Sequence, residues 1–355
     1  MNSGISIDQV ITQIRNVEAA KADFVVPTTR MRMFDAKLDI DGAGTFGVND
    51  WAHEQIGART KIPREYYKRM LKDDPSLLAT NINTWFAREP ERRLVRTLNG
   101  NVRAVLSDSF KPRENAIVAN SLLPVLETMP DLRVVSSNVT EKHLYLKILS
   151  MGLEGTFDVK KGDHYVGEVI KGGISISNSE VGCGAFTVAF FVMVLSCMNG
   201  MIRENIIRAF HLGSKLGNQE DRQIPSFYKP ETIEADSRAF ALQVRDTVVH
   251  AFDKKQFDAE LEKYNTAARN QVNPGRIDDV IQNVTKRYSL QVDEGKEILG
   301  RFIQGGDLSQ WGVAQAVTNL ANDRESYERS TSLEKIGGAI IDLKPAEWRA
   351  VACIQ

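Results

Sequence analysis

The chain has 355 residues, of which 42% are hydrophobic and 26% are charged, and its formal net charge is -1 at pH 7. These fractions are those of ordinary globular proteins, which predicts one large domain or two domains of ordinary size. A net charge so close to zero excludes a uniformly basic surface, so any contact with nucleic acid has to come from a local patch.

The spacing of the cysteines and the length of the hydrophobic runs predict the cellular compartment of the protein. The three cysteines, at positions 183, 197 and 353, form no CxxC pair, which argues against a structural zinc and for a reducing environment. The first residues lack the basic head and apolar segment of a signal peptide, and no apolar run reaches the roughly 20 residues that cross a bilayer. We therefore expect a cytoplasmic protein with no membrane contact, no cofactor and no metal.

Residues 1–87 are predicted to form a mainly helical region. Apolar residues recur at helical spacing over residues 5–22, and an alternating pattern predicts a strand between Met31 and Leu38. Residues 39–49 are glycine-rich and are expected to form a loop. Three short helices follow, with Asp50 and Asp74 as expected N-caps. They are compatible with a DNA-reading helix-turn-helix, although a packed helical cap is the favoured interpretation.

The most basic stretch of the chain covers residues 88–113. Asn99-Gly100 lies between two apolar runs and predicts a β-hairpin. Such a hairpin could follow a phosphate backbone; alternatively, its charges could protect a solvated edge strand from aggregation. Seven cations against three carboxylates leave a local charge of +4 (7 − 3). The candidate phosphate-binding cations are Arg88, Arg92, Arg93, Arg96, Arg103, Lys111 and Arg113.

A helix is predicted after this hairpin, over residues 114–130, and then several strands up to residue 197. The run FTVAFFVMVL at 186–195 is rich in aromatic and β-branched residues, which predicts a buried strand. Because hairpins dominate this region, the sheet should be largely antiparallel. An Asn199-Gly200 turn is expected to lead into a helix over residues 201–217. Its exposed face would carry the basic residues Arg203, Arg208, His211 and Lys215.

Four polar residues in this region are further candidates for a site. Asn178, Ser179 and Glu180 interrupt an otherwise apolar sheet, and Asn199 follows the buried strand. A buried carboxylate needs partners, which makes Glu180 a candidate functional group. The structural alternative is ordinary turn chemistry at the end of a strand.

The remainder of the chain, residues 218–355, reads as mostly helical, with Trp311, Val313 and Val317 on one face of a late helix. The predicted fold class is therefore α+β, with a largely antiparallel central sheet, flanking helices and a helical C-terminal region. The expected divisions are residues 1–87, 88–217 and 218–355.

Four segments together resemble a known family. They are NSEVG at 178–182, CMNGM at 197–201, the segment carrying His211, and WGVAQAVTNLAN at 311–322. These motifs are similar to the phage/plasmid-like family catalogued as domain of unknown function 932, and the likeness covers most of the chain from residue 50 to residue 340. The resemblance implies a mobile-element role in a bacterial cytoplasm. It implies no catalytic residues.

Three functions are compatible with these patterns. The first is non-enzymatic phosphate-backbone binding of single-stranded DNA by a homo-oligomer that anneals strands in recombination. A basic hairpin, a helix and a curved antiparallel sheet are similar to ring-forming phage annealases, at the level of fold. The second is a metal-dependent enzyme acting on nucleic acid, although HExxH and GxSxG motifs are absent. The third is an oligomeric scaffold or interaction protein. The candidate catalytic groups are Asp163, His164, Glu180, Cys183 and His211.

Overall fold

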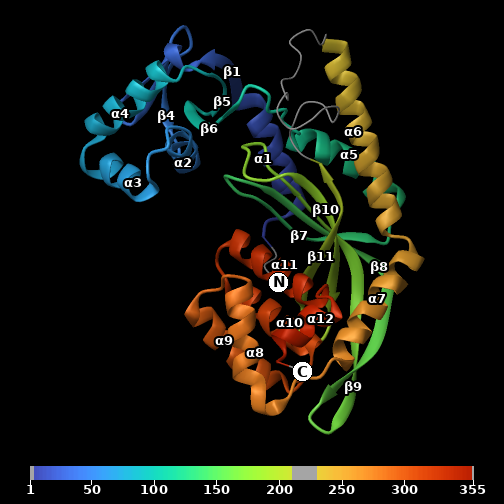
Figure 1. Ribbon diagram of the computed structural model, residues 1–355. Coiled ribbons are helices and arrows are strands. Elements are labelled where there is room, and N and C mark those ends of the chain that lie inside the picture. Colours follow the sequence, from blue (N-terminus) through green and yellow to red (C-terminus); the bar gives the residue numbers. More distant parts are fainter. Residues whose placement is uncertain (1–3, 210–229, 354–355) are drawn as a thin grey trace.

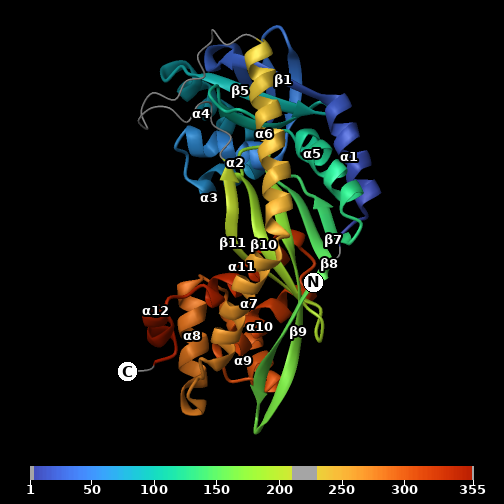
Figure 2. The same ribbon diagram turned by 90° about the vertical axis from the view of Figure 1, so that its right-hand side faces the viewer.

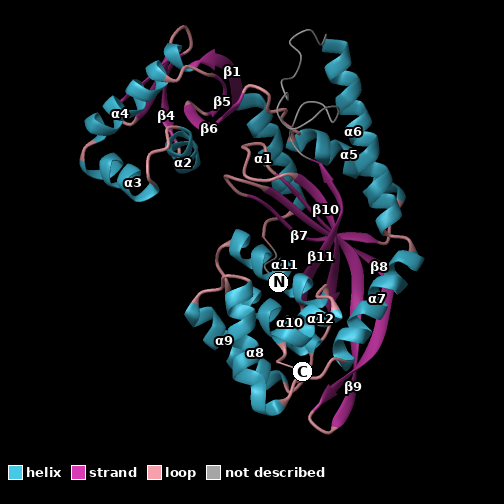
Figure 3. Cartoon of the chain, viewed as in Figure 1, coloured by secondary structure: helices cyan, strands magenta, loops and turns pink. Residues whose placement is uncertain are grey.

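The computed structural model describes residues 4–209 and 230–353, and the described chain is an α+β protein with two sheets (Figure 1). His211 and Lys215 lie outside the described residues. The predicted fold class is confirmed, since two mostly antiparallel sheets are combined with flanking helices and a helical C-terminal region (Figure 3).

A six-stranded sheet organises the N-terminal lobe, which we define as residues 21–107. Its strand order is β1-β5-β6-β4-β3-β2, and each neighbouring pair is antiparallel except β4 with β6. The predicted division at residue 88 therefore runs through one sheet. The strands are β1 (Lys21–Pro27), β2 (Met31–Phe34), β3 (Lys37–Ile40), β4 (Gly44–Val48), β5 (Arg92–Leu98) and β6 (Asn101–Ser107).

The predicted loop at residues 39–49 is mostly strand, so that prediction is wrong. Leu38 and Ile40 on β3 are buried, and β3 pairs with β4 through a tight turn. Burial of two alternate side chains stabilises the strand despite its glycine-rich neighbours.

Three helices cover this sheet as predicted: α2 (Asp50–Arg59), α3 (Arg64–Asp73) and α4 (Pro75–Arg88). The N-cap of α2 is Asn49 rather than the expected Asp50, because the Asn49 side chain accepts the hydrogen bond from the Ala52 amide. Asp74 caps α4 as predicted, with its carboxylate accepting from the Leu77 amide.

The second sheet has five strands in the order β11-β10-β9-β8-β7, all antiparallel. Its strands are β7 (Leu132–Val139), β8 (Leu144–Lys161), β9 (His164–Asn178), β10 (Phe186–Val194) and β11 (Asn199–Ala209). The long β8–β9 hairpin reaches beyond the other strands (Figure 2).

The helix predicted to begin at residue 201 is wrong for residues 201–209, which form β11. The edge of β10 offers unpaired backbone groups to this segment, and the β-branched residues Ile202 and Ile206 suit a pleated surface. Two register shifts in the β10–β11 ladder accommodate the pairing. Arg203 and Arg208 therefore do not share one helical face.

Helices pack along the five-stranded sheet. α1 (Ile7–Ala20), whose N-cap is Ser6, contacts β7, and α6 (Pro230–Ala251) contacts β9, β10 and β11 and packs on α5 (Asn115–Thr128). The helical C-terminal region packs on the sheet through one shared hydrophobic core. Its helices are α7 (Lys254–Arg269), α8 (Ile277–Arg287), α9 (Val292–Gly305), α10 (Gln310–Leu320), α11 (Tyr327–Ile341) and α12 (Pro345–Val351). Of the helices described, none has both the length and the hydrophobicity that crossing a membrane requires.

Candidate nucleic-acid interface

Arg96 and Arg103, two central members of the predicted phosphate-binding row, are buried in ion pairs. Arg96 is 0% exposed. Its Nε lies 3.0 Å from Asp23 Oδ1 and its Nη2 lies 2.7 Å from Glu114 Oε1. Arg103 Nη1 lies 2.9 Å from Glu180 Oε2. A guanidinium enclosed in this way cannot contact a phosphate, so the prediction is wrong for both residues.

Glu180 has a structural role at this junction between the two sheets. Its Oε1 accepts a hydrogen bond from the Asn115 amide at 2.7 Å, which satisfies the first turn of α5. Burial opposes the ionisation of Glu180, but Arg103 and the Asn115 amide hold its pKa below the usual value. The two residues before it are also engaged. Asn178 donates to Asn115 Oδ1 at 2.8 Å, and Ser179 Oγ accepts from the Cys183 amide at 3.0 Å.

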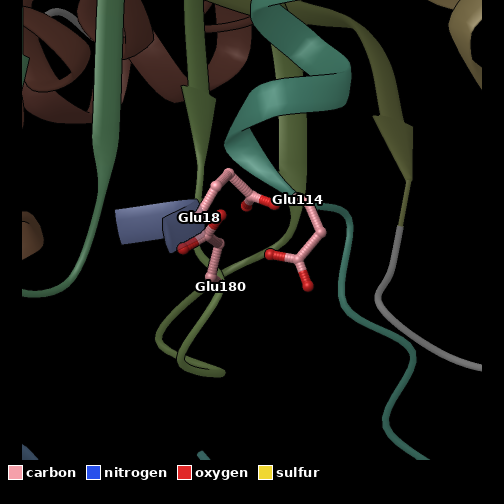
Figure 4. Close-up of side chains that lie close together, drawn as sticks. All are labelled: Glu18, Glu114 and Glu180. Carbon is pink, nitrogen blue, oxygen red and sulfur yellow. The ribbon is translucent and has the colours of Figure 1, made fainter. Parts of the chain in front are cut away.

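Three carboxylates meet beside this junction, from Glu18, Glu114 and Glu180, with ligand oxygens within 4.8 Å of one another (Figure 4). A metal-dependent enzyme could use such a cluster. Each carboxylate, however, already has a cationic partner: Lys21 Nζ lies 2.7 Å from Glu18 and 3.1 Å from Glu114, while Arg96 and Arg103 bind Glu114 and Glu180. These cations already neutralise the carboxylates, so the cluster fits an ionic network joining α1, α5 and the N-terminal lobe.

The other cations of the predicted row do not form a continuous track. Arg93 pairs with Glu91. Lys111 and Arg113 both pair with Asp236 on α6, and the Arg113 guanidinium also lies 4.4 Å from the Phe240 ring centroid. Arg88 and Arg92 are exposed on the N-terminal lobe. In the predicted row, therefore, only Arg88 and Arg92 are exposed without a described ion pair, and the other cations are paired with carboxylates.

The candidate catalytic groups are also dispersed. Asp163 and His164 lie at the exposed tip of the β8–β9 hairpin, at the opposite end of β9 from Glu180. Burial raises the pKa of the Cys183 thiol, which disfavours the reactive thiolate. Asn199 is buried in an amide network, where its Nδ2 donates to Gln315 Oε1 at 2.9 Å. Among the described residues, these groups form no shared catalytic arrangement.

A groove that the sequence patterns did not reveal gathers cations from five separate elements. It has a volume of about 1210 Å³ and lies between β11, α7, the end of α8, α11 and the start of α12, elements that are neighbours in Figure 1. We call it the cationic groove. Three carboxylates line it: Glu262, Asp342 and Glu347. Six lysine and arginine side chains line it: Arg203, Arg208, Lys263, Arg287, Lys335 and Lys344.

Some of these cations have a carboxylate partner among the described residues. Arg203 pairs with Asp342 and lies 3.5 Å from Glu260, and these partners raise its pKa even though burial opposes the charge. Arg287 pairs with Glu347. The Lys335 side chain, in contrast, makes no hydrogen bond and no ion pair with any described residue. Its surroundings bury it enough to lower its pKa, yet its side chain remains accessible from the groove.

Tyr288 adds an aromatic surface to the same groove, next to Arg287 and half-buried at the end of α8. Aromatic rings beside cations are the usual platform for stacking nucleic-acid bases. Of the cations predicted from sequence, only Arg203 and Arg208 reach this groove among the described residues. Lys335 and Tyr288 stand in unremarkable helical sequence, so no local signal could have identified them.

The comparisons with known proteins give no relative: no family model, no curated protein and no solved structure matches the chain. The resemblance to the phage/plasmid-like family stays a prediction.

Proposed function

We propose that the protein is a non-enzymatic nucleic-acid-binding protein that holds single-stranded DNA in the cationic groove. The observation that carries this proposal is the charge of the lining, six cations against three carboxylates, with no partner for the Lys335 ammonium among the residues the structure describes. A strand's phosphates would supply the missing counter-charge, and each phosphate contact would add salt-dependent affinity.

The size and chemistry of the groove favour a polymer over a small molecule. Its volume of about 1210 Å³ exceeds the roughly 300–1,000 Å³ typical of small-molecule pockets. Lys335 and Arg208 would contact phosphates, while Tyr288 would stack on a base. Contacts of this kind carry little sequence information, so we expect binding without strong sequence preference.

The wider role that we propose is strand annealing in recombination on a phage or plasmid, by a homo-oligomer in a bacterial cytoplasm. Its support is the resemblance of the sequence motifs to the phage/plasmid-like family. Binding through phosphates also leaves base edges free to pair, as annealing requires.

Mass photometry with and without a single-stranded oligonucleotide reports assembly and DNA loading together. A DNA-independent oligomer with no loading would favour a scaffold protein.

Fluorescence anisotropy with a labelled oligothymidine tests the groove directly. Lys335→Ala and Lys344→Ala should each weaken binding, and each should reduce the slope of log affinity against log salt by about 0.7, the value for one lost single-strand contact. Arg92→Ala removes an exposed cation of the hairpin and should leave affinity and slope unchanged. Salt-independent binding, or a loss confined to Arg92→Ala, would contradict the proposal.

A further inference from the structure

A second cavity, separate from the cationic groove, lies at the distal end of the C-terminal region. Its volume is about 580 Å³, and it is bounded by the far half of the β8–β9 hairpin, the turn between β10 and β11, the last turns of α9, and α10. No lining residue is shared with the cationic groove. We call it the carboxylate pocket.

Two buried carboxylates give this pocket its character. Glu168 and Asp307 line it, and each is 5% exposed. Glu168 accepts a hydrogen bond from the Ser196 hydroxyl, and Lys161 Nζ lies 3.8 Å from its Oε2. Asp307 differs, because neither of its carboxylate oxygens accepts a hydrogen bond from a described residue. Burying an ionised carboxylate without a partner is unfavourable. A ligand that supplies a hydrogen-bond donor to Asp307 would remove this cost.

The end of α9 adds the negative end of a helix to this pocket, whose lining also includes the cations Lys161 and Arg301. The helix stops at Gly306, which adopts a left-handed φ of 69°, and Asp307 follows directly. The last carbonyl groups of a helix carry the negative end of its dipole, which favours a cation nearby. Burial raises the pKa of Asp307 to about 6, although the nearby Ser309 hydroxyl and the Lys161 ammonium act in the opposite direction.

One donor without a partner among the described residues belongs to the lining of the same pocket. Gln315 lines the cavity, and its Oε1 accepts from Asn199 while its Nε2 has no acceptor among the described residues. Asn199 Oδ1 in turn accepts from Asn322 Nδ2 at 2.8 Å, which fixes the amide network. The free groups are therefore two carboxylate oxygens and one amide donor. This set matches a ligand with a cationic donor and a separate acceptor.

We propose that the carboxylate pocket binds a small organic cation, a primary ammonium compound with a hydroxyl group, whose ammonium lies on Asp307 and whose hydroxyl accepts from Gln315. A bare divalent cation fits less well. A metal ion needs about six oxygen ligands in a tight shell, whereas the cavity is far larger than one ion and offers only Asp307 as a free carboxylate. This binding does not depend on the DNA-binding proposal.

Isothermal titration calorimetry on the full chain tests the pocket, with ethanolamine and glucosamine as probes. Ethylene glycol and glucose are their neutral counterparts. We expect both amines to bind saturably and both neutral compounds to fail. Asp307→Asn should weaken amine binding by at least about tenfold, because a charge-assisted hydrogen bond is lost. Asp293→Asn is the matched control, since its carboxylate is exposed on the first turn of α9 and should leave binding unchanged.

A measurement on the unaltered protein guards against a variant that fails to fold. In carbon-detected NMR, saturating ethanolamine should lower the pKa of Asp307, because a paired ammonium favours the ionised form. The inference is overturned if the neutral compounds bind as tightly as the amines. It is equally overturned if Asp307→Asn binds the amines unchanged, if no probe binds, or if CaCl₂ binds at Asp307 in place of the amines.

Discussion

Arg96 on β5 donates a hydrogen bond from its Nη1 to the backbone carbonyl of Glu180, at 2.9 Å, across 84 positions of sequence. Both residues stand out in the sequence as candidates for function, one as a phosphate ligand and one as a catalytic carboxylate. Their contact places them instead in the network that joins the N-terminal lobe to the five-stranded sheet. The charges that look available in the sequence are used to hold the two sheets together.

Removing Arg96 should be strongly destabilising. Arg96→Ala removes the buried partner of Asp23 and leaves Glu114 with Lys21 as its remaining cation. Breaking a fully buried ion pair costs about 3–5 kcal/mol, which is the upper limit here because both carboxylates are partly exposed. Urea unfolding followed by circular dichroism measures this change. Arg92→Ala, four positions earlier and exposed, should change the free energy of unfolding by no more than about 0.5 kcal/mol. If Arg96→Ala lowered the free energy of unfolding no more than Arg92→Ala does, the ionic network would not stabilise the fold.

Glu180→Gln should destabilise the protein most at neutral pH. The folded-state pKa of Glu180 is depressed, because Arg103 and the Asn115 amide outweigh its burial. Its contribution is therefore present above the unfolded-state pKa and is lost as pH falls through the folded-state value. We expect the difference in unfolding free energy between the unaltered protein and Glu180→Gln to be large at pH 7. Below pH 4.5 it should shrink. A difference that is independent of pH would contradict this role.

Asp307→Asn should stabilise the protein at neutral pH, with the opposite dependence on pH. The folded-state pKa of Asp307 is raised from 3.8 to about 6 by burial. The protonated Asp307 carboxyl group therefore contributes fully to folding stability below its unfolded-state pKa, and this contribution is lost as pH rises through about 6. A shift of about two units corresponds to about 3 kcal/mol, which is the upper limit of the gain at pH 7. Urea unfolding at pH 4 and pH 7 measures it, and a variant that is less stable at pH 7 would contradict the argument.

The ion pair between Lys147 and Glu334 offers a test of buried charge in the core. Both side chains are enclosed, at 1% and 0% exposure, and the Lys147 ammonium lies 5.1 Å from the Tyr327 ring centroid. Lys147→Met alone leaves Glu334 buried and uncompensated, so it should cost about 3–5 kcal/mol. The double variant Lys147→Met/Glu334→Leu should recover most of that loss, since it removes both desolvated charges. A double variant as unstable as the single one would show that the pair is favourable in itself.

The amino-acid sequence alone determined those elements whose stabilising contacts are local. Ser6 begins α1 and Asp74 begins α4, because a side-chain oxygen three residues upstream accepts an amide of the first turn. Asn99-Gly100 makes the β5–β6 turn, where both residues have the positive φ that such turns require. Period-2 and period-3.6 patterns likewise identified most strands and the helical C-terminal region, because those periods follow from backbone geometry.

Only the tertiary structure decided what the charged residues do. Whether Arg96 meets solvent or a carboxylate depends on Asp23, Glu114 and Glu180, which lie far away in sequence. Residues 201–209 became a strand because the edge of β10 offered hydrogen bonds that no local pattern records. Lys335 and Tyr288 reach one groove because separate helices pack on the same sheet. Local propensity sets the elements, but long-range packing assigns each charge its partner, and that assignment separates a structural arginine from a candidate DNA contact.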